Sequence, residues 1–328
     1  MAFSADQLLE KVNTYLATMP YVREPKGLYA PIEYVLSLGG KRIRPVLMLL
    51  SYQLYKENVD DILPQAAGIE TYHNYTLLHD DLMDCADMRR NKPTVHKVWD
   101  ENTAILSGDA MLVLAYRLMN NCPERYLKQV MDIFSQTALE ICEGQQWDME
   151  FETRNDVTVP EYMEMIRLKT SVLLSAALKI GAVLGGASED DARKLYDFGI
   201  KMGLAFQLQD DYLDVYGDSK VFGKNIGGDI LCNKKTFMLI NALALADGIQ
   251  RKELEKWIAS TAFCPEEKIK AVTALYDKIG IGGICEEKIN AYYVEGLSLL
   301  ESMAVPSERK EELKSFVCLL YTSPSPRD

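Results

Sequence analysis

Apolar residues recur at helical spacing along most of the chain. Leu8, Val12 and Leu16 follow one another at intervals of four residues, the spacing that places side chains on one face of a helix. Stretches that alternate apolar and polar residues, as strands do, are scarce. Breaks that contain Gly or Pro leave room for helices of about two to six turns. The pattern predicts an all-α fold built as a single large antiparallel helical bundle.

Two of the predicted helices are long, and each ends in a cluster of aspartates. The first begins at Pro64, since proline is tolerated at the first helical position, and runs to about Ala86. At 1.5 Å per residue it would span roughly 33 Å. The second runs from Ser188 to about Tyr216. This symmetry predicts that the chemistry of the protein lies where the two helices end.

The predicted domain occupies residues 1–317, and the end of the chain differs from it. Residues 301–316 are amphipathic and charged, whereas residues 318–328, CLLYTSPSPRD, alternate Pro and Ser near their end. We predict that residues 318–328 form a non-native or disordered tail, of the kind that a cloning or sequencing artefact produces. A native genomic sequence with the same ending would contradict this prediction.

Charge and cysteine content exclude several classes of protein. The formal net charge is −12 and the Lys and Arg residues are scattered, which argues against nucleic-acid binding because that requires a basic face. Seven cysteines form no CxxC pair and their number is odd, so reduced thiols in a cytosol are expected. The pattern includes neither a charged and apolar leader nor an apolar run near the roughly 20 residues of a transmembrane span. These features predict a soluble cytoplasmic protein.

The first aspartate cluster, in LLHDDLMD, has the spacing of a metal site on a helix. Asp80 and Asp84 share a face because residues four apart lie one above the other, while Asp81 lies about 100 degrees round the helix. Like charges at this spacing repel each other unless a cation lies between them. Mg²⁺ prefers one or two carboxylates together with phosphate oxygens and water. The cluster is therefore suited to bind magnesium and a diphosphate.

The second cluster repeats the DDxxD spacing. Asp210, Asp211 and Asp214 lie in FQLQDDYLD, with Gln207 one turn upstream. A lone DDxxD is at least as often a solvated acidic helix end as a metal site. Two copies, each at the end of a long helix and each followed by cations, favour the metal site. If they face each other, they could hold several magnesium ions around one diphosphate.

Cations follow both clusters and also precede the first. Arg offers fork-shaped contacts to phosphate oxygens and Lys offers a point charge, so these residues supply the counter-charge that an acidic protein otherwise lacks. The earliest group lies in GGKRIRP and, taken alone, would be a basic helix cap. The cations concerned are Lys41, Arg42, Arg44, Arg89, Arg90, Lys92, Lys224, Lys234 and Lys235.

All the histidines of the chain, His73, His79 and His96, lie near the first cluster. The His79-Asp80 pair suggests a metal phosphohydrolase that uses His and Asp ligands. Such a site needs further His ligands elsewhere, and the sequence has no others. His73 could donate to a phosphate, and we expect structural roles for the other two.

The ordered set of motifs resembles the polyprenyl synthetase family, in particular its trans-isoprenyl diphosphate synthases of the short-chain, geranylgeranyl or farnesyl type. The motifs run from Gly39 to Lys235 and are GGKRIRP, HNYTLLHDDLMDCADMRRNKPTVH, LKTS, FQLQDDYLD and GKNIGGD. The resemblance implies the isoprenoid synthase fold, in which the bundle surrounds a central cavity, and usually a homodimer. It also implies an enzyme that condenses isopentenyl diphosphate with dimethylallyl, geranyl or farnesyl diphosphate.

The same resemblance implies roles for the candidate residues. Three Mg²⁺ ions would be bound by Asp80, Asp84 and Asp210, with Asp81, Asp211 and Asp214 in support. Isopentenyl diphosphate would be held by Lys41, Arg44, His73 and Arg90. The allylic diphosphate would be held by Arg89, Lys169, Thr170, Gln207, Lys224 and Lys234. Without the resemblance, Lys169 could be a surface lysine whose stem covers apolar neighbours. Asn91 departs from the Gly that the family commonly has there, but Asn tolerates left-handed backbone.

Product length is expected to depend on the residues below the first cluster. In the family, a bulky aromatic residue five positions before the cluster limits elongation, and Tyr75 stands there. Thr76 lies beside it and Tyr72 lies one turn deeper. This predicts a linear all-trans product of fifteen to twenty carbons, with the small Thr76 favouring twenty. Both tyrosines could instead be ordinary core residues.

Two rival functions remain open at this point. A type I terpene cyclase ionises similar substrates with Mg²⁺, but its second metal motif usually contains Asn, Ser and Glu. A catalytically silent partner subunit would have no need to keep so many mutually repelling charges. We therefore predict prenyl transfer, in which the allylic C–O bond ionises, the isopentenyl double bond attacks the cation and a proton is lost. Charge stabilisation and alignment would replace a protein nucleophile.

Overall fold

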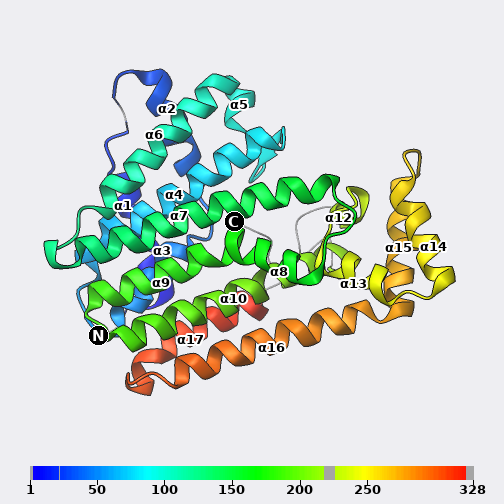
Figure 1. Ribbon diagram of the computed structural model, residues 1–328. Coiled ribbons are helices and arrows are strands. Elements are labelled where there is room, and N and C mark those ends of the chain that lie inside the picture. The colour runs from blue at the N-terminus through cyan, green and yellow to red at the C-terminus, as the bar shows by residue number, and fades with distance from the viewer. Residues whose placement is uncertain (1–2, 22, 218–225, 323–328) are drawn as a thin grey trace.

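The computed structural model describes residues 3–21, 23–217 and 226–322, and it confirms the predicted all-α fold (Figure 1). The first half contains α1 (Ala5–Ala17), α2 (Lys26–Ser37), α3 (Ile43–Gln53), the 3-10 turn η1 (Val59–Ile62), α4 (Leu63–Met83), α5 (Val95–Val98), α6 (Glu101–Met119) and α7 (Glu124–Thr153). The second half contains α8 (Val159–Ile166), the π-helical turn η2 (Arg167–Ser171), α9 (Val172–Gly185), α10 (Glu189–Tyr216), α12 (Gly228–Leu231), α13 (Phe237–Leu245), α14 (Gly248–Ala259), α15 (Pro265–Ile279), α16 (Ile281–Glu301) and α17 (Ser307–Thr322).

Helix α9 lies at the centre of the bundle. Every residue of it except Lys179 is buried, because α3, α7 and α10 all pack against it. Small residues allow the closest of these approaches. A Cβ atom at Gly203 of α10 would meet the Cα atom of Ser171 at 2.6 Å, so only glycine lets α10 lie this near to η2 and α9. Helix α16 packs along another face of α10 (Figure 1).

The two long helices predicted from the sequence are α4 and α10. Helix α10 begins and ends within one residue of the prediction. Helix α4 ends at Met83, three residues before the predicted Ala86, because the backbone at Cys85 is left-handed (φ 52°) and turns the chain out of the helix. Asp84 is the C-cap residue. The pair Asp80 and Asp84 therefore keeps its one-turn spacing, with the Asp84 amide donating to the Asp80 carbonyl at 2.9 Å.

A small hairpin follows the first aspartate cluster. Strands β1 (Met88–Arg89) and β2 (Lys92–Pro93) pair antiparallel, with Arg89 opposite Lys92. The turn residues Arg90 and Asn91 have φ values of 51° and 59°, as in the type I′ turns that suit tight hairpins. The expectation that Asn91 would tolerate left-handed backbone is thus confirmed.

The end of the described chain departs from the predicted domain boundary. Helix α17 continues to Thr322, so the boundary predicted at residue 317 falls inside a helix. The reason is that the apolar residues Cys318, Leu319 and Leu320 continue the helix, and Leu320 packs against the main core. Cys318 Sγ lies 2.7 Å from the Tyr293 hydroxyl. The Pro- and Ser-rich residues 323–328 lie outside the described residues, and the non-native origin of the tail stays a prediction.

One helical segment of the described residues is long and apolar enough to span a membrane by length and composition. It is Val159–Gly185, formed by α8, η2 and α9, and 83% of its apolar window is buried inside the fold. Burial of this kind is typical of the core helix of a soluble protein. The sequence analysis expected no apolar run of this length. It did not identify this segment, because polar residues of η2 interrupt the apolar pattern.

Candidate active site

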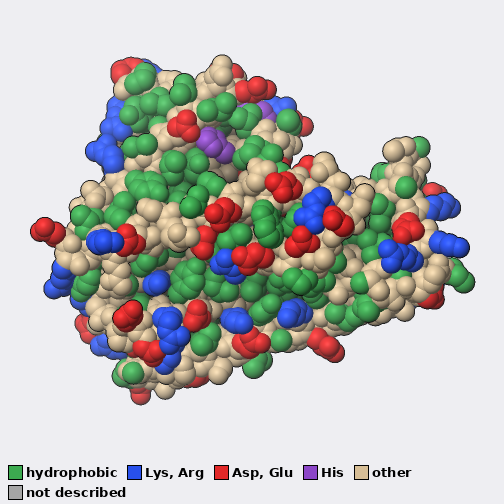
Figure 2. Space-filling view, in the orientation of Figure 1, with side chains coloured by type: hydrophobic (Ala, Val, Ile, Leu, Met, Phe, Trp, Pro, Cys, Tyr) green, Lys and Arg blue, Asp and Glu red, His purple; other side chains and the backbone are tan. Residues whose placement is uncertain are grey.

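A cavity of about 1540 Å³, including its open mouth, lies where α4 and α10 meet α7, α8 and η2. Charged side chains line one part of it, among them Asp80, Arg89 and Lys169. Tyr72, Tyr75 and Ile141 line another part, which is apolar. On the molecular face in Figure 2, acidic and basic side chains are interspersed and form no single basic patch. The cavity therefore combines a polar mouth with an apolar interior.

The aspartates of the first cluster have different surroundings. Asp81 is 5% exposed, and Arg89 clamps it with Nε and a terminal nitrogen, both 2.7 Å from Asp81 Oδ1. Asp80 faces the cavity, where the Lys169 ammonium lies 3.5 Å from it. Burial and the neighbouring Asp80 carboxylate raise the pKa of Asp84. Asp81 therefore supports the arginine, while Asp80 and Asp84 form the repelling pair that a cation would relieve.

In the second cluster, two of the aspartates serve as supports. Asp211 is 1% exposed and accepts hydrogen bonds from the Tyr162 hydroxyl and from the Gln207 amide, the latter at 3.2 Å. Burial, and then the charge of Asp229, raise the pKa of Asp211 to about 7. The Asp214 carboxylate accepts from the backbone amide of Asp229 at 3.0 Å, at the start of α12. These two carboxylates hold the middle of α8 and the start of α12 against α10.

The carboxylates suit magnesium but do not form a preassembled cage. Within residues 3–21, 23–217 and 226–322, no group of three His, Cys, Asp or Glu side chains is close enough to hold a metal ion. Mg²⁺ takes few carboxylates and completes its shell with phosphate oxygens and water. The donor set therefore fits ions that are bound together with a diphosphate, and it does not fit a metal site complete without one.

The π-helical turn η2 presents Lys169 and Thr170 to the cavity. The Lys169 ammonium lies 2.6 Å from Asp148 of α7 and so bridges Asp148 and Asp80. The Thr170 hydroxyl donates to the Gln207 side chain at 3.3 Å. One-turn π-bulges inside helices often occur at functional sites. This turn links the first cluster to the second, because its two adjacent residues contact one cluster each.

Three residues of this arrangement were missed by the sequence analysis. Asp148 lies among other acidic residues of α7 and has no DDxxD spacing. Tyr162 follows the apolar pattern of α8, which is typical of a core residue. Gly144 lets α7 approach η2, since a Cβ atom there would meet the Leu168 carbonyl carbon at 2.8 Å. The EGQQWD stretch, with its Gly one turn before an Asp, was the available signal.

The residues predicted for isopentenyl diphosphate gather beside α3. A guanidinium nitrogen of Arg44 lies 2.9 Å from His73 Nε2, and both side chains line the cavity. The Arg90 guanidinium donates to the Gly39 carbonyl, so the hairpin after α4 closes on the GGKRIRP loop that carries Lys41.

Of the remaining predicted site residues, some lie at the cavity and others do not. Lys234 lines the same cavity as Arg89 and Gln207, whereas Lys224 lies outside the described residues. His79 Nε2 is 3.2 Å from the Ile105 carbonyl of α6, a structural contact that leaves the phosphohydrolase reading without support.

The chain-length residues belong to an aromatic group along α4. Tyr72 and Tyr75 have ring centroids 5.4 Å apart, and Tyr72 packs edge-on against Phe134 at 5.2 Å. Tyr75 also packs against His79 at 4.9 Å. Tyr72, Tyr75 and Thr76 all line the cavity. Tilted and edge-on aromatic rings on α4 therefore form one boundary of the apolar part of the cavity, beside aliphatic side chains such as Ile141.

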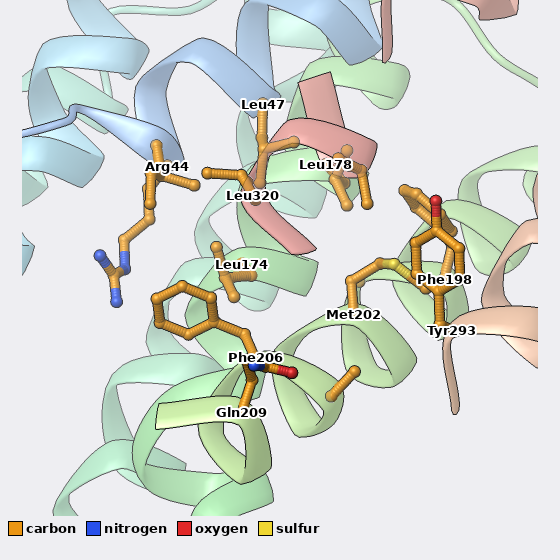
Figure 3. A pocket seen from close by; sticks show the side chains of 14 residues that line it. Arg44, Leu47, Leu174, Leu178, Phe198, Met202, Phe206, Gln209, Tyr293 and Leu320 are labelled. Carbon is orange, nitrogen blue, oxygen red and sulfur yellow. The ribbon is translucent and has the colours of Figure 1, made fainter. Parts of the chain in front are cut away.

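A second, smaller cavity lies on the other side of Arg44 and Phe206, which line both (Figure 3). Its empty volume is about 650 Å³ and its lining is almost entirely apolar. Leu47, Leu174 and Leu178 surround it, and Leu320 of α17 closes it (Figure 3).

Comparisons with known proteins agree on one family. The polyprenyl synthetase family model matches residues 25–276. The chain is 41% identical over 273 residues to a short chain isoprenyl diphosphate synthase of Methanocaldococcus jannaschii, covering 83% of each chain. It is 46% identical over 224 residues to a geranylgeranyl diphosphate synthase of Methanosarcina mazei, covering 67% of this chain and 69% of the relative.

Solved structures show the same fold. A geranylgeranyl pyrophosphate synthase superposes with a TM-score of 0.90 at 43% identity, covering 98% of both chains. The enzyme of that name from Corynebacterium glutamicum, solved in complex with isoprenyl diphosphate and magnesium, superposes with a TM-score of 0.86 at 26% identity, covering 98% of this chain and all of that one. This is the isoprenoid synthase fold, and by sequence and structure alike the chain belongs to the polyprenyl synthetase family.

Proposed function

We propose that this protein is a trans-prenyltransferase. It condenses isopentenyl diphosphate with dimethylallyl, geranyl or farnesyl diphosphate and releases diphosphate, giving a linear all-trans prenyl diphosphate of fifteen to twenty carbons. The observation that carries this proposal is the link through η2, where Lys169 contacts Asp80 and Thr170 contacts Gln207 at one polar cavity mouth. A polar mouth above an apolar interior suits a diphosphate with an isoprenoid chain.

The residues divide into two diphosphate sites. The allylic diphosphate is held by Arg89, Lys169, Thr170, Gln207, Lys224 and Lys234. Isopentenyl diphosphate is held by Lys41, Arg44, His73 and Arg90. Asp80, Asp84 and Asp210 would hold three Mg²⁺ ions, and such ions would supply positive charge against the departing diphosphate.

Within this site the chain aligns two substrates and contributes no nucleophile. The allylic C–O bond breaks and its electron pair leaves with the diphosphate. The isopentenyl double bond then forms the new C–C bond, and the resulting cation loses a proton to the released diphosphate. Lys169 and Arg89 stay within reach of the developing negative charge, where fixed cations act most strongly. The aromatic residues exclude water from the allylic cation.

Product length follows from the aromatic boundary on α4. Tyr75 carries the bulk and Thr76 leaves space beside it, which favours twenty carbons over fifteen. Relatives of this chain include geranylgeranyl diphosphate synthases and, at 35% identity over 297 residues, a geranylfarnesyl diphosphate synthase of Aeropyrum pernix. Condensation is preferred to terpene cyclisation because both DDxxD clusters and the second set of cations are present.

The proposed working form is a cytoplasmic homodimer. Large apolar side chains stand exposed on α6 and α7, with Leu106 and Val113 each 60% exposed and Leu139 55% exposed. Exposed apolar surface of this kind marks protein–protein contacts. Sedimentation of the purified protein would test the dimer directly.

Incubation with Mg²⁺, labelled isopentenyl diphosphate and each allylic primer, followed by chromatography of the dephosphorylated products, tests the function. We expect linear alcohols of fifteen or twenty carbons, abolished in Asp80→Ala and Asp210→Ala. Asp197→Ala is the matched control, because Asp197 also lies on α10 but does not line the cavity, and it forms an ion pair with the surface residue Arg193 at 3.8 Å. Cyclic products would favour a terpene cyclase, and no condensation with any primer would favour a silent subunit.

A further inference from the structure

The loop that brings Lys234 to the active-site cavity rests on α15. Figure 1 shows α14 and α15 as a pair beyond α12 and α13, and α12 contacts α15. Gly227, at φ 86°, packs so closely that a Cβ atom there would meet Ile269 Cγ1 at 2.6 Å. The Lys234 amide donates to the Asp229 carbonyl at 2.9 Å. A helix outside the site therefore supports this loop from one side, while Asp214 of α10 holds the start of α12 from the other.

Lys268 of α15 makes direct polar contacts to that loop. Its side chain is 1% exposed, and its ammonium lies 2.7 Å from Asn233 Oδ1 and 3.3 Å from the Leu231 carbonyl. It also lies 4.2 Å from the centre of the Phe263 ring. Asn233 is left-handed (φ 54°) and immediately precedes Lys234. Lys268 thus holds the residue from which Lys234 projects.

The ammonium group of Lys268 is buried and costs free energy to desolvate. Burying an ammonium group is costly unless charges or hydrogen bonds compensate. In the part of the chain that the structure describes, Lys268 makes no salt bridge, and its acceptors are a carbonyl and an amide oxygen. Methionine would fill a similar volume without this cost. Lys268 therefore ties α15 to this loop by polar contacts that methionine could not make.

We propose that Lys268 is a positioning residue for prenyl transfer, which fixes Asn233 so that Lys234 faces the allylic diphosphate. The inference rests on the proposed function, because it assigns Lys234 to the allylic site. Lys268 touches no substrate, and it acts only through Asn233 and the carbonyl of Leu231.

Steady-state kinetics of Lys268→Met test the proposal. We expect the KM for the allylic substrate to rise about tenfold. A change of this size corresponds to the loss of one modest charge-assisted contact. The KM for isopentenyl diphosphate should stay within about twofold of the wild type. Asn233→Gly keeps the left-handed backbone but removes the oxygen acceptor, together with the side-chain bond to the Ile258 carbonyl at 3.1 Å. It should give the same selective change even if Lys268→Met folds poorly. Lys268→Arg, which keeps a cationic donor, should restore part of the loss.

Two further variants separate positioning from folding. Lys310 is also buried, at 4% exposure, and donates to the carbonyls of Leu300, Glu301 and Met303 far from the site. Lys310→Met should lower the melting temperature without changing the ratio of the two KM values. In a Lys234→Ala background, Lys268→Met should have no further effect on the allylic KM, because the residue through which it acts is gone.

The outcomes distinguish this inference from the proposed function. An active wild type with unchanged KM values in both Lys268→Met and Asn233→Gly would overturn the positioning role and leave prenyl transfer intact. Equal losses for both substrates, or full additivity with Lys234→Ala, would also overturn it. A wild type that condenses no primer would remove the proposed function and this inference together.

Discussion

The GGKRIRP loop rests on a buried ion pair, and breaking that pair should destabilise the protein strongly. Arg42 and Glu70 are each 3% exposed at their side chains, with the guanidinium 2.6 Å from the carboxylate. Arg42 also donates to the Leu36 carbonyl at 2.6 Å. Glu70 accepts a second hydrogen bond from Asn74 at 2.8 Å. Because the loop is fixed at Arg42, between Lys41 and Arg44, this pair also fixes the proposed isopentenyl diphosphate site.

Replacing Glu70 by Leu leaves the Arg42 charge buried without its partner. Removing one member of a buried pair costs about 3–5 kcal/mol, a large part of the stability of a typical domain. Urea unfolding followed by circular dichroism should show a loss of that size with an unchanged dependence on urea concentration. The double variant Arg42→Met/Glu70→Leu should regain most of the stability, since both charges are gone. It should nevertheless raise the KM for isopentenyl diphosphate, because Arg42→Met also removes the bond to the Leu36 carbonyl.

The control is the exposed pair Lys11 and Asp60, with atoms 2.8 Å apart and side chains 28% and 55% exposed. Asp60→Asn should cost less than about 1 kcal/mol. A Glu70→Leu protein as stable as Asp60→Asn would refute the reasoning, since it would mean that the Arg42 charge is solvated without Glu70.

Three further changes have definite expected outcomes. Gly144→Ala should lower the free energy of unfolding by about 1–3 kcal/mol through overpacking and reduce turnover by displacing Lys169. The control is Gly283→Ala on α16, where a Cβ atom meets nothing within 4 Å, so it should be neutral or stabilising. Equal activities of the two variants would contradict this prediction. Tyr75→Ala should open the aromatic boundary and yield products longer than twenty carbons, detectable by chromatography, and an unchanged product would show that another residue sets the length. Mg²⁺ added with inorganic diphosphate should raise the melting temperature, equivalent to about 2.7 kcal/mol at one hundred times the Kd; Asp84→Asn should lose most of that shift, and an undiminished shift would place the ions elsewhere.

Sequence patterns predicted the helices better than the contacts between them. Helix α10 follows its prediction closely because a strong N-cap at Ser188 begins it and Gly217 follows its last residue. The DDxxD spacing likewise placed Asp80 and Asp84 on one face. Asp148 could not be found in this way, because it reaches Lys169 only through the packing of α7 on η2. The separate roles of Asp81 and Asp211 also depend on tertiary partners, Arg89 and Tyr162, that spacing does not reveal.

The π-helical turn at Arg167–Ser171 lies within one continuous helical segment, α8 to α9. Activity should therefore be sensitive to the number of residues in this segment. A π-bulge corresponds to one extra residue in a helix, and each residue of an α-helix turns the following side chains by about 100°. Deleting one residue here would produce an ordinary α-helix in which α8 and α9 could each still bury an apolar face. Lys169 and Thr170 could no longer both face the cavity. A one-residue deletion could thus preserve a helical, well-packed protein while uncoupling the two aspartate clusters, so indels within this segment are a more sensitive probe of prenyl transfer than most point substitutions.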